Sequence, residues 1–327
     1  MTKPRYAVPS MADIQAIPWN SLNVISTFSG CGGTCLGYRM AGYRILWANE
    51  FIPEARKVYE LNHPGTVLNG QDIREVTVEA VLEATGMKVG EVDVLEGSPP
   101  CASFSTNGLQ SKGWGNVQKY SDTYQRTDDL FWEFGRLVQG IQPKVFVAEN
   151  VAGLVKGVAI GYFKQIYKML EDCGYRVEAR LLDAAQLGVP QVRKRIFIQG
   201  VRQDLGIAPS FPKPWPYSYT VREVLPHIAT IENANGGPYQ RHAYQPANRP
   251  ARTIQQYRPV GVHLVDDPKA HRRMTIDELK PLCGFPDDFK LVGTFNRQWE
   301  RLGRAVPPLM ARRIAEVIER NLTRGET

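Results

Sequence analysis

One cysteine in the chain stands where a thiol could act as a nucleophile. Cys101 follows two prolines and the short run 93–96, which is typical of a buried strand in a parallel sheet. Open α/β sheets bind their ligands at the carboxyl ends of such strands, and the prolines would hold the thiol on a stiff loop. A cysteine in a strand-to-loop turn can also be an ordinary small apolar residue. The residues elsewhere in the chain decide between these two interpretations.

Carboxylates follow other strands of the same predicted sheet. Glu149 comes directly after the apolar run 144–148, so its side chain would face the same crevice as Cys101. Glu50 ends the second predicted strand, and a carboxylate there can accept hydrogen bonds from both hydroxyls of a ribose. Asp72 could bind an adenine amine, but it would serve equally well as a cap for the backbone that follows it.

Glycines and arginines complete the set of candidate binding groups. A β-prone run over residues 22–28 leads into the glycine-rich segment 29–37 and then a helix, which is the first unit of a nucleotide-binding sheet. Arg193 and Arg195 precede a further strand, where guanidinium groups could bind phosphate or carboxylate. Charge on a solvated hairpin would also explain them.

Residues 106–127 lack periodicity, and a long loop beside a nucleophile is typical of a lid.

Length and composition set the class of protein. The chain has 327 residues, 43% hydrophobic and 22% charged, which suits a globular protein with one large and one smaller domain. Its net charge of +7 is compatible with a polyanionic partner. Five cysteines without a secretory signal or a long apolar segment indicate a reduced cytoplasmic protein, with no membrane span. Cys31 and Cys35 are spaced like half a zinc site, but no second pair follows, so we expect no metal.

Five short motifs occur along the chain in one order. They are Phe28-Ser29-Gly30-Cys31-Gly32-Gly33, Pro99-Pro100-Cys101 with Phe104-Ser105, Glu149-Asn150-Val151, Gln191-Val192-Arg193-Lys194-Arg195, and Gly303-Arg304-Ala305-Val306-Pro307-Pro308. Together they resemble the DNA (cytosine-5)-methyltransferases over almost the whole chain. The resemblance implies an α/β fold, with a doubly wound, mostly parallel, Rossmann-like sheet and a second, smaller target-recognition domain. We expect a catalytic and cofactor-binding domain over 1–204, the recognition domain over 205–298, and a helix over 299–327 that returns to the catalytic domain.

The resemblance implies catalytic roles for four residues. The Cys101 thiolate would add to C6 of cytosine and make C5 nucleophilic, while Glu149 would protonate or hydrogen-bond N3 to ease that attack. Arg195 resembles the arginine that holds the base and the catalytic groups, with Arg193 close by. Because a stacked base is out of reach, the cytosine must be flipped out of the duplex, and the lid of residues 106–127 would close over it.

The resemblance also implies a cofactor, S-adenosylmethionine. Glu50 would bind its ribose, Asp72 and Ile73 its adenine, and the glycine turn would approach it through the backbone. The expected cofactor-binding residues are Phe28, Gly30, Gly32, Gly33, Glu50, Phe51, Asp72, Ile73, Pro99, Arg304, Ala305 and Val306.

Double-stranded DNA is the implied partner, bound by a monomer. The stretch 226–248 between the expected entry and exit of the recognition domain is short, so we expect a short or relaxed target sequence. For any single residue there, a solvated loop explains the sequence as well as a groove contact does. DNA contacts are expected from Ser105, Gln110, Lys112, Tyr239, Arg241, His242 and Arg252. Restriction-modification, phage self-protection and epigenetic marking are all compatible roles.

The chain departs from the family's pattern at two positions. Ser26 stands where an acid is usual, so a negative charge is missing near the cofactor's amino-acid end. Arg304 replaces the usual asparagine near the transferred methyl group, where a cation beside a sulfonium is unfavourable. Arg304 could pair with an acid or a phosphate, the protein could be inactive, or the donor could be carboxy-S-adenosylmethionine, which would give 5-carboxymethylcytosine. The presence of Cys101, Glu149 and Arg195 argues against an inactive relative.

Other classes of protein compete with this interpretation. An RNA cytosine-5 methyltransferase is the nearest alternative, because relatives with this architecture modify transfer RNA. A non-catalytic DNA-binding protein would tolerate loss of Cys101 and would bind DNA without the cofactor. A nicotinamide-dependent dehydrogenase could share the glycine turn, but it would not need the Pro-Pro-Cys and Glu-Asn-Val motifs.

Overall fold

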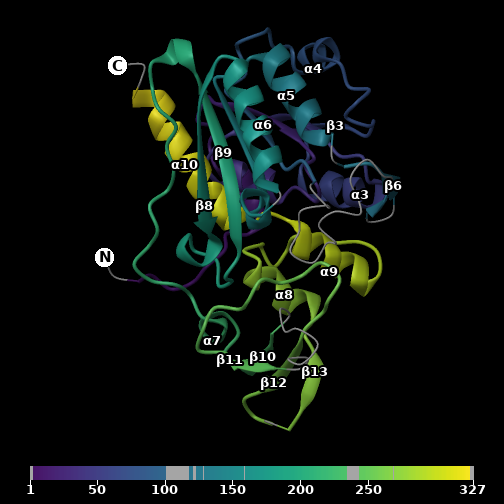
Figure 1. Ribbon diagram of the computed structural model, residues 1–327. Helices are drawn as coiled ribbons and strands as arrows, with labels where there is room; N and C mark the ends of the chain where they lie inside the picture. Colours follow the sequence, from purple (N-terminus) through teal and green to yellow (C-terminus); the bar gives the residue numbers. More distant parts are fainter. Residues whose placement is uncertain are drawn as a thin grey trace.

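The structure is a computed structural model that describes residues 3–100, 118–120, 123–127, 129–157, 159–233, 243–267 and 269–324. Its larger sheet has seven strands: β1 (Asn23–Thr27), β2 (Arg44–Asn49), β3 (Val67–Asn69), β4 (Val94–Gly97), β7 (Val145–Val151), β8 (Tyr175–Asp183) and β9 (Lys194–Arg202). Their order across the sheet is β3-β2-β1-β4-β7-β9-β8 (Figure 1). Pairing is parallel from β3 to β7, and β9 runs antiparallel to β7 and β8. The predicted doubly wound, mostly parallel sheet is confirmed.

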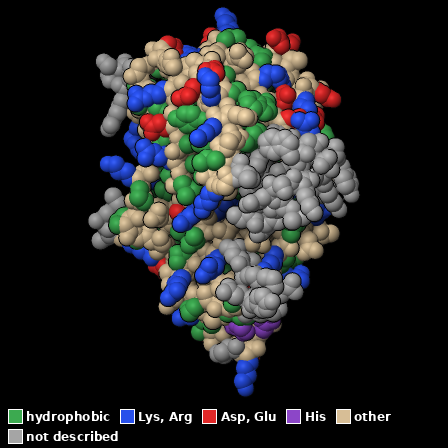
Figure 2. All heavy atoms as spheres, in the orientation of Figure 1, with side chains coloured by type: hydrophobic (Ala, Val, Ile, Leu, Met, Phe, Trp, Pro, Cys, Tyr) green, Lys and Arg blue, Asp and Glu red, His purple; other side chains and the backbone are tan. Residues whose placement is uncertain are grey.

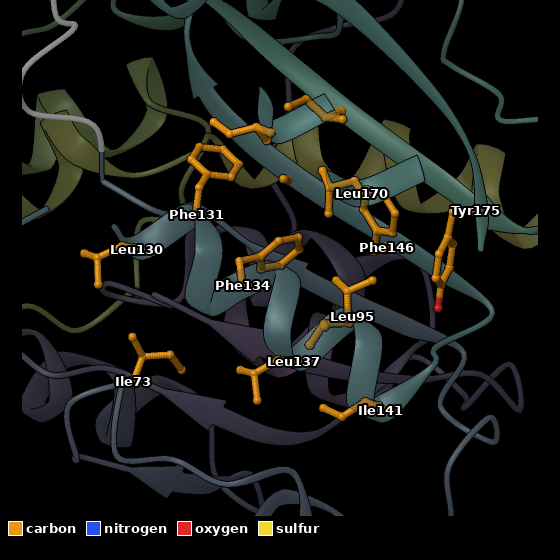
Figure 3. Close-up of a cluster of buried hydrophobic side chains, with 14 of the residues drawn as sticks. Ile73, Leu95, Leu130, Phe131, Phe134, Leu137, Ile141, Phe146, Leu170 and Tyr175 are labelled. Carbon is orange, nitrogen blue, oxygen red and sulfur yellow. The ribbon is translucent and has the colours of Figure 1, made fainter. Parts of the chain in front are cut away.

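Helices cover both faces of this sheet because the buried strands are apolar on both sides. On one face, Leu95 and Phe146 belong to a core cluster with three helices, and Figure 3 shows Phe134 and Phe146 lying against each other there. On the other face, Val24 and Val94 belong to a second cluster with three more helices. The first three helices are α4 (Val78–Thr85), α5 (Leu130–Ile141) and α6 (Ala159–Asp172), and the others are α2 (Gly33–Met40), α3 (Pro53–Asn62) and α10 (Pro308–Arg324).

Helix α10 comes from the far end of the chain and packs on α2. The two helices touch closely, because a Cβ built on Gly37 would lie 2.4 Å from the Cβ of Ala311. The Tyr43 hydroxyl also donates a hydrogen bond of 3.0 Å to the Ala315 carbonyl. The helical cover of the large sheet is therefore completed by residues near the end of the sequence. The domain boundaries at residues 204 and 298 stay predictions.

A second, smaller sheet has the strand order β11-β10-β12-β13 and lies at the lower end of Figure 1. All of its strand pairs are antiparallel. Its strands and the helices near it are α7 (Val221–Val224), β10 (Ile228–Glu232), β11 (Tyr244–Pro246), β12 (Gly261–Leu264), β13 (His271–Arg273), α8 (Ile276–Leu282) and α9 (Phe295–Arg304). The smaller recognition unit predicted from the sequence thus has a sheet of its own. Strands β10 and β11 both fall inside the stretch 226–248, where the sequence analysis expected no strand, and residues 234–242 between them lie outside the described residues.

Short elements fill the connections. Helix α1 (Met11–Ala16) begins with a capping box between Ser10 and Asp13, and α8 begins with one between Thr275 and Glu278. Within the segment expected to be a lid, β5 (Gln118–Tyr120) and β6 (Thr123–Gln125) form an antiparallel pair, and residues 101–117 lie outside the described residues. Turns of 3-10 helix occupy Ala152–Val155, Ala184–Gln186 and Gln203–Leu205. Throughout the described ranges, no helix is both long and apolar enough to span a membrane.

Candidate active site

An ion pair marks the carboxyl end of β7. Arg195 Nε lies 3.0 Å from Glu149 Oε1, and the two side chains are only 15% and 13% exposed. The pairing follows from the sheet, because β9 runs antiparallel to β7 and places Arg195 opposite Val151, two residues beyond the glutamate. Residues two apart in a strand point to the same face. The structure therefore brings together Glu149 and Arg195, as the sequence predicted, at an edge where parallel sheets bind ligands.

The neighbouring side chain holds the loop that leads to the candidate nucleophile. Asn150 Nδ2 donates a hydrogen bond of 2.9 Å to the Pro99 carbonyl, and both residues are buried. This bond ties the end of β7 to the loop after β4, two residues before Cys101. Cys101 itself lies outside the described residues. Its role as nucleophile stays a prediction, supported by the fixed position of the backbone that precedes it.

Arg193 lies deeper than Arg195 and binds backbone instead of a carboxylate. Its guanidinium donates to the carbonyls of Ile254, Gly303 and Arg304, at 3.4, 3.0 and 3.0 Å. Burial, and then the charge of Arg195, lower the pKa of Arg193 to about 9. A guanidinium held by three carbonyls positions the chain segments that pass it. The catalytic role expected for Arg193 stays a prediction, and the contacts described here are those of a positioning residue.

The glycine turn after β1 has one open position and two crowded ones. Phe28 and Gly30 both have positive φ, of 54° and 58°, and a Cβ built on Gly30 would meet no atom within 4 Å. In contrast, a Cβ on Gly32 would lie 2.0 Å from His63 Nε2, and one on Gly33 would lie 2.4 Å from the Val306 carbonyl oxygen. The space over Gly30 can therefore accept a ligand, whereas Gly32 and Gly33 are required by packing.

Glu50 organises this turn from the end of β2. Its two carboxylate oxygens accept hydrogen bonds of 2.7 Å from the backbone N–H groups of Gly30 and Ile52. Burial raises the pKa of the Glu50 carboxyl, and the two backbone bonds oppose that rise. Each carboxylate oxygen can accept a further hydrogen bond, so the group retains acceptor capacity for a hydroxyl. These residues fit a nucleoside with a ribose, and the site contacts themselves stay predictions.

At the predicted adenine site, the carboxylate of Asp72 is already occupied by hydrogen bonds within the protein, unlike that of Glu50, which retains acceptor capacity. The Asp72 carboxylate accepts bonds from the backbone and guanidinium of Arg74, which also binds Asp129 at 2.7 Å. The capping alternative for Asp72 is thus present in the structure. Ile73 is buried in the core beside α5, and Phe51 is half-buried.

Arg304 is the residue for which the sequence allowed three explanations. Arg304 Nη2 lies 3.0 Å from Glu300 Oε1 within α9, and it also hydrogen-bonds the Tyr257 hydroxyl. Glu300 is 3% exposed and pairs through its other oxygen with Arg297 at 3.0 Å. Pairing with an acid, the first explanation, is what the structure shows. Ala305 and Val306 follow directly and lie against the glycine turn at Gly33. The cofactor contacts expected of them stay predictions.

Comparisons with known proteins show the family of the chain. The family model for C-5 cytosine-specific DNA methylases matches residues 22–254 and 213–320. The chain belongs to this family. A type II methyltransferase of Neisseria gonorrhoeae, M.NgoPII, is 31% identical, with 94% of this chain and 98% of that protein covered. M.FnuDI, a type II methyltransferase of Fusobacterium nucleatum, is 30% identical, with 93% and 96% covered.

Solved structures of low identity share the fold. An E. coli prophage protein described as a DNA modification methyltransferase gives a TM-score of 0.72 at 21% identity, with 93% of this chain and 100% of that chain covered. The Dnmt2 methyltransferase of S. pombe gives 0.65 at 16% identity, with 93% and 99% covered. For this C-5 cytosine methylase, S-adenosylmethionine is the methyl donor that the family uses.

Of the residues expected to contact DNA, Arg252 is the one that the structure describes. Arg252 is exposed on the segment between β11 and β12. On the face shown in Figure 2, Lys and Arg side chains are spread over both the large-sheet region and the lower, small-sheet region, whereas acidic side chains gather mainly at the upper end. Over the described part of the chain, no group of three His, Cys, Asp or Glu side chains could hold a metal ion. Ser105, Gln110, Lys112, Tyr239, Arg241 and His242 lie outside the described residues.

Three buried polar residues near the candidate site were not among the residues expected from the sequence. Asn150 holds the loop before the cysteine, and its place in a known motif was a usable signal. Gln191 is fully buried, and its amide hydrogen-bonds the Leu282 carbonyl at 3.2 Å and the Ile254 N–H at 3.1 Å. It therefore links the segment before β9 to α8 and to the segment between β11 and β12. Glu96 is a buried acid in an otherwise apolar strand. That contrast was visible in the sequence and was not used.

Proposed function

We propose that this methylase transfers a methyl group to C5 of cytosine in DNA, with Cys101 as nucleophile and Glu149 as the group that acts on N3 of the base. The observation that carries the proposal is the Glu149–Arg195 ion pair at the carboxyl edge of the sheet. The loop before Cys101 is anchored to the adjacent Asn150. A carboxyl group and a thiol on neighbouring strand ends are the arrangement that attack on a cytosine ring requires.

The chemistry follows from what each side chain can do. The thiolate of Cys101 forms a bond to C6 of a cytosine that has been flipped out of the duplex, and the electron pair moves toward C5. Glu149 hydrogen-bonds or protonates N3, which stabilises the charge that the attack places on the ring. Arg195 fixes the glutamate's orientation. After C5 has gained its methyl group, loss of the C5 proton expels the Cys101 thiolate and restores the aromatic ring.

S-adenosylmethionine, when bound, supplies an electrophilic methyl carbon on a sulfonium. The turn at Gly30, with Glu50 behind it, offers the open backbone and the carboxylate that would hold its nucleoside. Ala305 and Val306 would close the site from the other side, because they already lie against the turn. We propose that the cofactor is also contacted by Phe28, Phe51, Asp72, Ile73 and Pro99.

The ordinary donor is favoured over carboxy-S-adenosylmethionine. Arg304 is engaged by Glu300 and Tyr257, so its charge is already partly compensated inside the protein. Nucleoside mass spectrometry on DNA incubated with both donors in competition would test this. We expect 5-methylcytosine as the main product. A majority of 5-carboxymethylcytosine would mean that Arg304 selects the anionic donor.

Recognition and biological setting complete the proposal. We place target reading on the small sheet and its neighbouring loops, with a short double-stranded DNA target bound by a monomer in the cytoplasm. The type II methyltransferases that resemble the chain over nearly their whole length support a role in restriction-modification.

Covalent trapping tests the proposal directly. A duplex that contains 5-fluorocytosine cannot lose a C5 proton, so an enzyme of this mechanism stays bonded to it through sulfur. We expect a stable protein–DNA adduct that needs the cofactor and disappears in Cys101→Ala. Cys173→Ala is the matched control, because this free cysteine is half-buried in the turn directly after α6 and its loss should leave the adduct intact. An adduct on RNA but not on DNA would support the RNA alternative, and none on either would contradict the mechanism.

A further inference from the structure

A buried carboxyl group on β4 lies beside the position where the family's usual acid is missing. Glu96 is 3% exposed and stands opposite Ser26 of β1 in the parallel pair. The Ser26 hydroxyl donates a hydrogen bond to Glu96 Oε1, and Ser26 Oγ lies 2.7 Å from Ser29 Oγ. Ser29 immediately precedes the open glycine at position 30. A chain of polar groups therefore leads from the buried carboxyl to the turn proposed to hold the cofactor.

The strand itself does not require this carboxyl group. Its strand neighbours Val94 and Leu95 are fully buried and apolar. Among the residues that the structure describes, Glu96 has no Lys or Arg partner, and its remaining contact is Cys35 Sγ at 3.9 Å from Oε1. Burying a carboxyl without a cation costs free energy, and an apolar side chain would fill the space without that cost. A cation from outside the chain would explain why an acid stands here.

The geometry also explains the serine on β1. Ser26 and Glu96 point to the same face of the sheet as Val24 and Val94, which lie two residues earlier on the two strands. An aspartate at position 26 would direct its carboxylate into the space that now holds the hydrogen bond between the two residues. Glutamate is one methylene longer than aspartate, so from the adjacent strand its carboxylate reaches this same space. The acid that the family usually carries on β1 is thus supplied in this chain by β4.

We propose that Glu96 recognises the ammonium group at the amino-acid end of S-adenosylmethionine, in place of the acid that Ser26 lacks. This assignment rests on the proposed function, since it takes S-adenosylmethionine as the cofactor. A carboxylate paired with an ammonium group forms charge-assisted hydrogen bonds, which are strongest where water is excluded. Glu96 is thus a cofactor-recognition residue, separate from the groups that act on the base.

The pairing makes cofactor binding depend on a proton. Burial, and to a smaller degree the charge of Glu149, raise the pKa of Glu96 to about 8, so the carboxyl is mainly neutral at pH 7 in the empty protein. In the described part of the chain, the other titratable groups that face it are Cys35 and Tyr38 of α2 and Tyr59 of α3, and none of these carries positive charge. An incoming ammonium group favours the charged carboxylate. Binding at pH 7 therefore releases a proton.

Two ligands separate this role from a structural one. S-adenosylhomocysteine carries the ammonium group, whereas 5′-methylthioadenosine shares the nucleoside and lacks the amino acid. In titration calorimetry, Glu96→Gln should weaken S-adenosylhomocysteine about tenfold, because it removes one charged pair, and should leave methylthioadenosine within about twofold. The double variant Ser26→Asp with Glu96→Val returns the acid to β1 and should recover most of the lost affinity.

The outcomes are distinguishable. Equal weakening of both ligands by a folded Glu96→Gln, or weakening of neither, overturns the role of Glu96 while leaving the cofactor assignment intact. Wild-type protein that binds neither ligand contradicts the cofactor and with it the proposed function. Titrations in two buffers of different ionisation enthalpy add a measurement that a structural role would not change. Wild-type protein should release a proton on binding S-adenosylhomocysteine at pH 7, and Glu96→Gln should not.

Discussion

Two glutamates on adjacent strands of the large sheet have opposite surroundings. Glu149 on β7 is 13% exposed and pairs with Arg195, whereas Glu96 on β4 is 3% exposed and contacts a serine hydroxyl and a thiol. Both point to the face of the sheet that α2 covers. The same side chain is thus held beside a cation at one place and, among the residues that the structure describes, beside only a hydroxyl and a thiol at the other. Both carboxyl groups are largely buried, so what distinguishes them is the neighbour: an arginine for Glu149, and a serine and a cysteine for Glu96.

The strongest way to test this contrast is to remove each charge separately. Glu149→Gln should lower kcat for methyl transfer about a hundred- to ten-thousand-fold, because the group that acts on N3 can no longer give or hold a proton. Binding of S-adenosylhomocysteine should stay within about twofold of the wild type, since Glu149 serves the base. Single-turnover kinetics and calorimetry would measure the two effects.

Glu178→Gln provides the matched control for that variant. Glu178 on β8 also pairs with an arginine, Arg180, but at a surface where the side chains are 32% and 62% exposed. Its loss should leave kcat unchanged, because surface ion pairs contribute little. If Glu149→Gln weakened cofactor binding as much as Glu96→Gln does, the division of tasks between the two carboxyl groups would be wrong.

An effect on stability comes next in size. The folded pKa of Glu96, about 8, lies above the ordinary value of 4.5, so the folded protein binds an extra proton between these values. Its contribution to stability is full below about pH 4.5 and is lost as pH rises toward about 8, by roughly 1.4 kcal/mol per pH unit. Urea denaturation of the empty protein should show this slope on top of other groups' contributions. Glu96→Gln should remove it, and an unchanged slope would contradict the protonated state.

The smallest effect is expected at a third glutamate. Glu300 is held by two arginines, so Arg304→Asn leaves it with Arg297 and should lower stability by only about 1 kcal/mol. Methyl transfer should stay within a few-fold of the wild type, measured by nucleoside mass spectrometry. A gain of methyl transfer at the expense of carboxymethyl transfer would instead show that Arg304 chooses the donor.

The large sheet could be predicted from the sequence because each of its strands has a local pattern of apolar residues. Short apolar runs that end in Glu50, Cys101 or Glu149 mark the carboxyl edge, and the glycine turn marks its first crossover. The pairing of Arg195 with Glu149 also followed, since both lie in motifs that the resemblance covers. The small sheet was harder, because β10 and β11 are short strands separated by residues with loop composition.

Roles that depend on distant partners were beyond the sequence. The bonds from Arg193 to residues 254, 303 and 304 join segments whose closeness only the fold creates. The single helix expected over 299–327 is divided in the structure into α9, which ends at Arg304, and α10. Arg304 pairs with Glu300 one helical turn earlier in α9, and the sequence offered such an acid as only one of three explanations. Glu96 gave a local signal, but its meaning required the register that places it opposite Ser26.

The packing of α10 on α2 has a consequence for how the protein is made. The helix that follows the cofactor turn stays partly uncovered until residues 308–324 have left the ribosome, some 270 positions later, as the bond from Tyr43 to Ala315 illustrates. During synthesis the nascent chain therefore exposes an apolar surface at Gly37 and its neighbours for most of its translation. A chain cut short before α10 would retain every predicted catalytic residue, yet it would offer that surface to chaperones and proteases.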